Sequence, residues 1–406
     1  MKLENKILFW TGTGHFFNHV GNYLTPALLI YLQTDIPLTQ TERGLLGSIP
    51  MILLVILSTG VGWIGDRYPY SKKHLIWVGT AGLGGFSVLM ASASTFIDLA
   101  LATIILGVSL STYHPVAFTF LTGMKNQDKN MGINAVFGNA GSATTPLLAM
   151  LFSVLWNWRI AFLLFAGMQI VAGIAIWIFF PNNSELHDDL INGNLAENEK
   201  ELKATNHVFI LMLLLVLISA SRAPVFRCIS YFTTIVFSDA FLLGNVESSI
   251  LTGVVLGLGA FSTYCMGYFN NRRISKGVPR SKRIGFRVDT ILLSSGVATI
   301  LLIILALLPP SMTIVVLLVY VILTVFFFLG ASVLPTIMSE VAPGEIGSSF
   351  GILFAGSTLA GAIAPTVFGF LADNYDFNAS FLFLGIVALT CLVFIFMFKF
   401  LYNREN

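Results

Sequence analysis

Five polar side chains recur along the first apolar segment of this 406-residue chain, at spacings that place them on one stripe of a helix. They are Thr11, His15, Asn18, His19 and Asn22. Residues three, four, seven and eight positions apart share one helical face. Imidazole exchanges a proton near neutral pH, because its unperturbed pKa is about 6.5. We therefore expect His15 and His19 to carry a proton and Asn18 and Asn22 to bind a ligand, unless the stripe only hydrogen-bonds neighbouring helices.

A third imidazole, His114, stands between Tyr113 and Pro115 in a later apolar segment. Because proline leaves a backbone carbonyl without its helical partner, we expect His114 to relay a proton or contact a ligand beside a kink. The alternative is a hydrogen-bonded structural histidine. His15 and His19 also have the spacing of a metal-binding pair, but no Cys or carboxylate nearby in the sequence completes a ligand set. We therefore expect neither a metal site nor a cofactor.

Two arginines, Arg222 and Arg227, lie inside another apolar segment, on either side of Pro224, which is expected to kink its helix. A guanidinium inside a bilayer is costly, and no acid lies deep in the other apolar segments. Guanidinium presents a rigid fork to carboxylate, phosphate or phosphonate. We expect Arg222, and less directly Arg227, to hold an anionic substrate, with Tyr231 as a further hydrogen-bonding candidate. In the alternative, Arg222 pairs with backbone carbonyls or Asp289, Arg227 extends to the membrane surface, and Tyr231 only packs.

The segments that must position these side chains are long and apolar. The chain is 56% hydrophobic and only 10% charged, with a mean hydropathy of +0.83, whereas soluble domains carry roughly 25% charge. About 20 apolar residues cross the ~30 Å core of a bilayer. We predict an all-α polytopic membrane protein with twelve transmembrane helices. The predicted spans are 7–32, 43–66, 74–95, 97–123, 130–155, 158–180, 207–237, 246–270, 284–308, 311–338, 346–373 and 376–402.

A polar segment divides these spans into six and six. The predicted organisation is an N-terminal six-helix bundle (1–180), a cytoplasmic linker (181–206) and a C-terminal six-helix bundle (207–406). Lys and Arg are concentrated on the side that carries both termini, which predicts a plasma-membrane protein with both termini in the cytoplasm. The run from Arg272 to Arg283 fits the same rule, so we expect no nucleic-acid partner.

The two predicted bundles carry an internal repeat. Residues of the fifth span recur at a constant offset in the eleventh, and Pro115 recurs at nearly the same offset as Pro335. The recurring residues are Gly132, Ile133, Ala143 and Pro146, which correspond to Gly351, Ile352, Ala362 and Pro365. Repeats of this parallel kind predict a substrate site near the bilayer midplane, between the bundles, and alternating access by rocking.

At this point a family resemblance becomes clear. Gly62, Asp66 and Arg67 resemble the signature between helices 2 and 3 of the major facilitator superfamily, and Trp158-Arg159 resembles its usual entry to helix 6. Within that superfamily the chain is similar to the fosmidomycin-resistance type of efflux transporter. That similarity rests on GHFFNH (14–19), Gly62–Pro69, Tyr113–Pro115, Gly141–Leu148 and Pro343–Gly347. Two departures stand out, His19 after Asn18 and Asn271 in the second half, where the family pattern has acids.

The resemblance implies that Gly62, Asp66 and Arg67 form an inner gate. It also implies proton antiport, so the expected function is secondary active efflux of a small organic anion or zwitterion. The main alternative is proton-coupled uptake, or symport, of a carboxylate- or phosphate-bearing metabolite. A remote alternative is a non-transporting membrane receptor. No nucleophile with a base and no acid–base pair stands out, so the protein is not expected to be an enzyme. The expected partners are the anionic substrate, protons and the lipid bilayer, and a monomer is expected.

Overall fold

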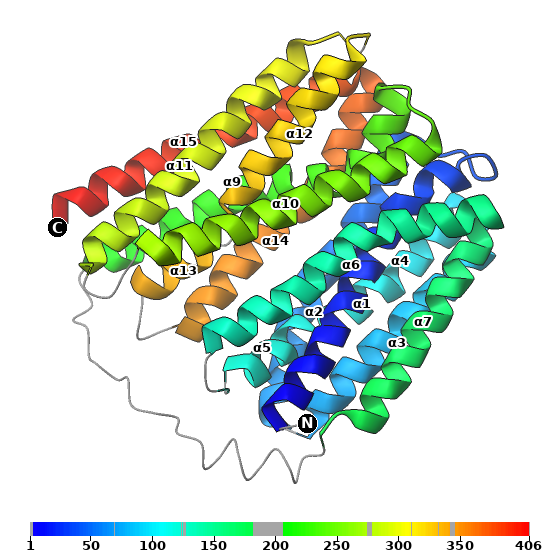
Figure 1. The fold of residues 1–406 in the computed structure, drawn as a ribbon, viewed down its shortest axis with the longest axis horizontal. Coiled ribbons are helices and arrows are strands. Elements are labelled where there is room, and N and C mark those ends of the chain that lie inside the picture. Colours follow the sequence, from blue (N-terminus) through cyan, green and yellow to red (C-terminus); the bar gives the residue numbers. More distant parts are fainter. Residues whose placement is uncertain are drawn as a thin grey trace. The chain divides into compact units, whose positions relative to one another are not determined.

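The chain is helical throughout the part that the computed structural model describes (Figure 1). The described residues are 3–405, apart from 69, 123, 125–126, 182–205, 274–277, 310, 332 and 342–345. Nearly all of the predicted linker 181–206, and most of the motif Pro343–Gly347, therefore lie outside the described residues. No strand occurs among the described residues.

The helices of the first part of the chain follow the predicted spans closely. They are α1 (Leu3–Leu32), α2 (Gln40–Arg67), α3 (Ser71–Ser92), α4 (Phe96–Ser111), α5 (His114–Thr122), α6 (Gln127–Leu155) and α7 (Trp158–Phe179). The second part contains α9 (Asn206–Ile235), the π-helix η1 (Val236–Ala240), α10 (Asn245–Arg273), α11 (Arg280–Leu307), α12 (Thr313–Leu329), α13 (Val333–Val341), α14 (Ile346–Asn374) and α15 (Phe377–Glu405).

Two predicted spans are broken into two helices each. The span predicted over 97–123 is α4 followed by α5, and the span predicted over 311–338 is α12 followed by α13. Each break comes just before a proline, Pro115 or Pro335, because proline lacks the amide hydrogen that would bond the carbonyl four residues earlier. Pro224 acts differently, since α9 stays helical through it.

The helices have the length and hydropathy of a membrane protein. Within the described residues, nine helical segments qualify as candidate membrane spans by length and composition. Two of them join neighbouring elements, Phe96–Leu121 across α4 and α5 and Val208–Ala240 across α9 and η1. With α1, α14 and the pair of α12 and α13 added to these nine, the architecture is that of an all-α protein with twelve transmembrane helices in two six-helix bundles.

The chain forms two compact units. Unit 1 comprises Met1–Leu38, Leu45–Asn198 and Gly244–Gly253, and unit 2 comprises Thr39–Gly44, Glu199–Leu243 and Val254–Asn406. In unit 1, α1 packs along α6 and α3 packs along α7; in unit 2, α9 packs along α14 and α11 packs along α15. The first membrane helix of each unit therefore pairs with the fifth, and the third with the sixth. This common pairing is the structural counterpart of the repeat in the sequence.

Polar contacts fix individual helix ends within unit 1. The Asn157 side chain caps α7 by accepting from the amide of Ile160 at 2.9 Å. The Arg159 guanidinium donates to the carbonyls of Ala91 and Ala93, at 2.9 and 2.7 Å. These carbonyls stand where α3 ends and its helical bonding runs out. The Trp158-Arg159 motif thus begins one helix and completes the end of another.

Candidate functional site: an imidazole cluster and a buried guanidinium

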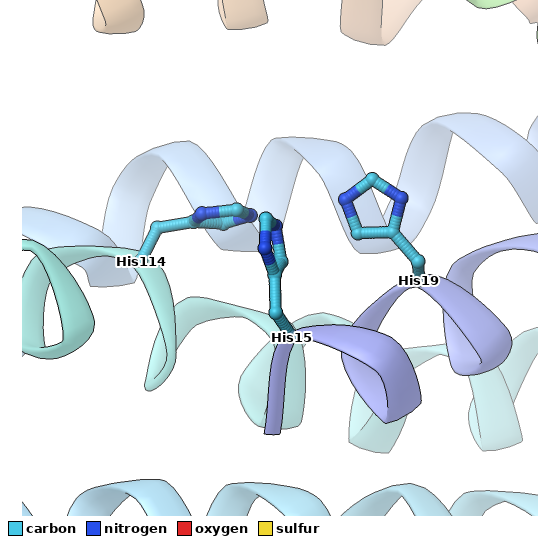
Figure 2. Close-up of side chains that lie close together, drawn as sticks. All are labelled: His15, His19 and His114. Atoms are coloured by element: carbon cyan, nitrogen blue, oxygen red, sulfur yellow. The ribbon is translucent and has the colours of Figure 1, made fainter. Parts of the chain in front are cut away.

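The three predicted imidazoles of unit 1 come together. His15 and His19 lie one turn apart on α1, and His114 is the first residue of α5. The ring centroid of His15 lies 4.7 Å from that of His19 and 5.3 Å from that of His114, both in edge-to-face geometry. Figure 2 shows the His15 ring between the other two. One ring nitrogen of each residue lies within 4.8 Å of one ring nitrogen of each of the others.

Neighbouring polar groups fix the His15 ring. Its Nδ1 lies 2.8 Å from the backbone oxygen of Asn134 on α6 and 3.0 Å from the amide nitrogen of the same residue's side chain. A carbonyl oxygen only accepts hydrogen bonds and an amide nitrogen only donates them, so Nδ1 donates to the first group in one tautomer of the ring and accepts from the second in the other. The Tyr113 ring stacks on His15 with centroids 5.0 Å apart, and its hydroxyl lies 2.8 Å from the Thr11 backbone oxygen and 3.0 Å from Asn134 Oδ1.

Glycines on α6 give the histidines their space. A Cβ atom at Gly138 would lie 2.8 Å from the His15 ring, and one at Gly141 would lie 2.4 Å from the backbone oxygen of Phe16. Separations below 3.0 Å do not occur for real Cβ atoms, so α1 and α6 can approach this closely only because both residues are glycine. His19 Nδ1 meets the same helix, 2.7 Å from Ser142 Oγ.

The asparagines of the α1 stripe differ in their surroundings. Asn18 is buried, and its side-chain nitrogen lies 3.5 Å from the backbone oxygen of Leu110 near the end of α4. That contact is the helix-to-helix hydrogen bond that the alternative interpretation of the stripe predicted. Asn22 is half-buried. Asn134, by contrast, was missed by sequence reasoning, because its role depends on the packing of α1 against α6 and no local motif marks it.

Arg222 is the central charge of unit 2. Its side chain on α9 is buried, and its guanidinium donates to Ser294 Oγ at 3.2 Å, to the Phe327 backbone oxygen at 2.8 Å and to Ser295 Oγ. The guanidinium carbon also lies 4.5 Å from the centroid of the Phe327 ring. The crevice beside it, lined in part by Ser221 and Cys391, is too narrow for a water molecule.

The carbonyl that Arg222 meets is supplied by the break between α12 and α13. At this break the amide of Ala331 bonds to the oxygen of Phe328, so the Phe327 oxygen loses its helical partner. Gly330 stands at the same break, and a Cβ there would lie 2.8 Å from the Arg222 guanidinium. Arg222 thus bonds a backbone carbonyl, as one of the alternatives from the sequence predicted. The other predicted partner, Asp289, lies 2.6 Å from Lys399 instead.

The other predicted ligand residues of unit 2 pack inside it. The aliphatic part of the Arg227 side chain packs against α14 at Gly361. A Cβ atom at residue 361 would lie only 2.9 Å from Arg227 Cγ. The buried Tyr231 hydroxyl donates to the backbone oxygen of Arg43 at 2.9 Å. In this conformation its donor is therefore committed to protein, as the packing alternative predicted.

The predicted gate residues stand at the end of α2. A Cβ atom at Gly62 would lie 3.6 Å from Pro115, which is an ordinary contact distance. Arg67 is exposed at the last position of the helix. The side chain of Asp66 lies outside the described part of the structure, so the gate stays a prediction.

Sequence reasoning missed a buried ion pair in unit 2. Arg43 is 1% exposed and lies 2.6 Å from Asp239, and Asp373 accepts from the backbone amides of Gln40 and Thr41 at 2.8 and 2.7 Å. The sequence placed these acids near the ends of spans. No signal there pairs Asp239 with Arg43, which is 196 residues away.

Comparisons with known proteins agree with this architecture. The family model described as Major Facilitator Superfamily matches residues 11–348 and 277–406. The chain is 26% identical over 151 residues to the "Uncharacterized MFS-type transporter YfnC" of Bacillus subtilis, which is 36% of either chain. It is 24% identical over 176 residues to the "Probable sulfoacetate transporter SauU" of Cupriavidus necator, which is 41% of this chain and 39% of that relative. Each match thus spans less than half the length of the curated relative.

Solved structures share the fold. A bacterial homologue of the human lysosomal transporter Spinster, in an inward-facing and unoccupied conformation, superposes with a TM-score of 0.81 at 14% identity, over 100% of this chain and 99% of that one. A mutant of the nucleoside transporter NupG gives a TM-score of 0.69 at 14% identity, over 98% of this chain and 100% of that one.

Fold and site define a polytopic membrane transporter with polar and charged groups buried inside its helix bundles. The chain belongs to the Major Facilitator Superfamily. The family model and the matched relatives are those of transporters and not of enzymes. The superfamily resemblance on Gly62, Asp66 and Arg67 is thereby confirmed.

Proposed function

We propose that this protein exports a small organic anion or zwitterion in exchange for protons. The observation that carries the proposal is the state of Arg222. Within the described residues, the oxygen atoms recorded around its guanidinium belong to two serines and a backbone carbonyl, all of them neutral. Among the described residues no carboxylate forms an ion pair with it, and a buried charge without an opposite charge is unfavourable.

The substrate is the natural source of that opposite charge. When the bundle rearranges during transport, the guanidinium can exchange its serine partners for the oxygens of a carboxylate, sulfonate or phosphonate, which match its planar fork. Arg227, Asn18, Asn22 and Tyr231 are proposed as further contacts with the substrate. The name of one matched relative mentions sulfoacetate, a small organic anion. That name supports the proposed substrate class.

The histidine cluster is proposed to carry the coupled protons. His15, His19 and His114 carry imidazoles, which can take up and release a proton, and they gather on α1 and α5. The proposed direction, efflux, rests on the resemblance to fosmidomycin-resistance transporters. We further propose that the protein acts as a monomer in the plasma membrane, with both termini in the cytoplasm.

Transport in proteoliposomes tests the proposal. Vesicles loaded with radiolabelled sulfoacetate, or with another anion that raises the unfolding temperature of the purified protein, receive an imposed pH gradient. Under antiport, acidifying the outside accelerates exit of the anion; under symport, acidifying the inside does so. Flux that ignores pH but requires sodium would remove the histidines from coupling, and flux that requires ATP would refute secondary transport.

The inner gate is proposed to involve Asp66 with Gly62 and Arg67 at the end of α2. Asp66→Asn is expected to leave anion affinity within a few-fold while slowing turnover, because a gate acts on the conformational cycle and not on the site. Counterflow rates and equilibrium binding, measured on the same preparation, separate the two effects. A large loss of binding with normal turnover would contradict the gate assignment.

A further inference from the structure

The three imidazoles of unit 1 form a set that their sequence positions do not reveal. His15 and His19 are a turn apart, whereas His114 belongs to a different membrane helix and reaches them only because α4 ends and α5 begins at this position. From the sequence, His15 and His19 lacked a third ligand. The structure supplies one, with one nitrogen from each ring inside a common 4.8 Å limit (Figure 2).

We propose that His15, His19 and His114 bind a divalent first-row transition-metal ion, with zinc as the representative case. Zinc lies 2.0–2.1 Å from histidine nitrogens in tetrahedral sites, so three such nitrogens stand roughly 3.4 Å apart. The present spacing is at most 4.8 Å. Binding therefore requires the three nitrogens to approach one another by at most about 1.4 Å.

The surroundings of the rings resemble the outer shell of a metal site. Histidines that bind metals generally donate their other ring N–H to a carbonyl, carboxylate or water, which fixes the tautomer and the ring orientation. His15 Nδ1 lies 2.8 Å from the Asn134 carbonyl oxygen, and His19 Nδ1 lies 2.7 Å from Ser142 Oγ, both on α6. In the tautomer that donates from Nδ1, each residue keeps Nε2 as its metal ligand. Gly138 gives the His15 ring a defined position against the same helix.

The donor set selects the kind of metal. Imidazole nitrogens suit Zn²⁺, Co²⁺, Ni²⁺ and Cu²⁺, whereas Mg²⁺ and Ca²⁺ require oxygen ligands. Three neutral ligands leave the full charge of the ion in place and a fourth position open. That position takes water or an anionic group. The metal site does not depend on the anion proposed above, because the three ligands come from the protein alone.

Protons and metal compete for the same nitrogens. A protonated imidazole has no lone pair to donate, so metal binding releases protons and weakens as the pH falls through the range in which the histidines titrate. Zinc is therefore expected to inhibit any proton-coupled step that uses these rings. The same competition makes the site measurable by titration.

The test uses the full-length protein, purified in detergent with an affinity tag that contains no histidine. Co²⁺ is added first, because tetrahedral nitrogen ligation gives an intense visible spectrum, and Zn²⁺ then displaces it in a competition titration. X-ray absorption of the zinc-loaded protein counts imidazole ligands. We expect one ion per chain, three imidazoles, and affinity that falls as the pH is lowered, because protons compete with the metal for the imidazole nitrogens.

Variants identify the ligands. His15→Ala, His19→Ala and His114→Ala should each abolish the cobalt spectrum, while His74→Ala should not, because His74 is exposed on α3 away from the cluster. Ser142→Ala keeps all three ligands but removes the contact to His19, and is expected to weaken zinc binding about 10-fold. This variant keeps the test decisive if a histidine variant fails to fold, which monodispersity and unfolding temperature report.

Three results would overturn the site. They are zinc binding that survives in all three histidine variants, fewer than two imidazoles by X-ray absorption, or no binding at concentrations up to about 1 mM, which corresponds to only −4.1 kcal/mol. Failure of the metal site is distinguishable from failure of the proposed transport. Proton-driven flux of the anion is measured with a chelator present, so it does not require the metal.

Discussion

The two units share a contact at the break in their fourth membrane helix, but the side chains that make this contact differ in charge. In each, the fourth membrane helix breaks before a proline, and a side chain from the first membrane helix meets a carbonyl at the break. In unit 1 the side chain is the neutral amide of Asn18, at the Leu110 oxygen; in unit 2 it is the guanidinium of Arg222, at the Phe327 oxygen. The repeat thus preserves the contact but changes its charge.

The difference extends to the groups around each break. The break in unit 1 begins α5 with His114 and brings it to His15 and His19, groups whose charge follows the pH. The break in unit 2 surrounds Arg222 with serine hydroxyls, and a guanidinium keeps its charge at any physiological pH. The two breaks thus place imidazoles in unit 1 and a guanidinium in unit 2.

The largest expected effect separates pH response from anion binding. Replacing His15, His19 and His114 together by Gln is expected to abolish acceleration of flux by a pH gradient, because the variant lacks the imidazoles that are proposed to carry the protons. Counterflow, which needs no gradient, should continue. His74→Gln serves as the matched control, being an exposed histidine of the same unit. If flux through the triple variant still responded fully to the pH gradient, the histidines of unit 1 would not be the groups that couple protons to transport.

The second prediction reverses the test in unit 2. Arg222→Gln is expected to weaken binding of the anionic substrate at least ~10-fold, or about 1.4 kcal/mol, without changing the pH response of flux. Arg222→Lys keeps the charge but loses the planar fork, and should weaken binding less. Equilibrium binding measures both variants, with exposed Arg404→Gln as a control for lost charge. If Arg222→Gln bound the anionic substrate as tightly as the parent protein, Arg222 would have a structural role and not a substrate-binding one.

The parts of this comparison differ in how far the sequence reveals them. Twelve long apolar runs predict the helices, because a chain that crosses a bilayer must hydrogen-bond its own backbone, as a helix does. Pro115 marks the position of one break. The meeting of His114 with His15 depends on the packing of α5 against α1, which no local pattern records. Asn134 was missed for the same reason. The partners of Arg222 lie on α11 and α12, so the sequence could only offer the carbonyl and Asp289 alternatives together.

A third prediction concerns the space that unit 1 reserves for its cluster. Gly138→Ala is expected to destabilise the protein by about 1–3 kcal/mol, as overpacking does, since the added Cβ would lie 2.8 Å from the His15 ring. Gly132→Ala on the same helix is the matched control, because nothing lies within 4 Å of a Cβ there. Thermal unfolding in detergent ranks the two variants. Equal unfolding temperatures would mean that the His15 ring is free to move away.

The prediction with the smallest expected effect tests whether Asp289 balances the charge of Arg222 in unit 2. Asp289 lies 2.6 Å from Lys399, and both side chains are well exposed, at 54% and 39%. Exposed ion pairs contribute only about 0–1 kcal/mol, so Asp289→Asn should change the unfolding temperature little and leave anion affinity unchanged. Arg222 gains nothing from this carboxylate in the present arrangement, because its recorded partners are neutral. If Asp289→Asn instead strengthened anion binding substantially, Asp289 would be competing with the substrate for the guanidinium. Arg222 would then already have a counter-charge within unit 2, and the main support for an anionic substrate would be lost.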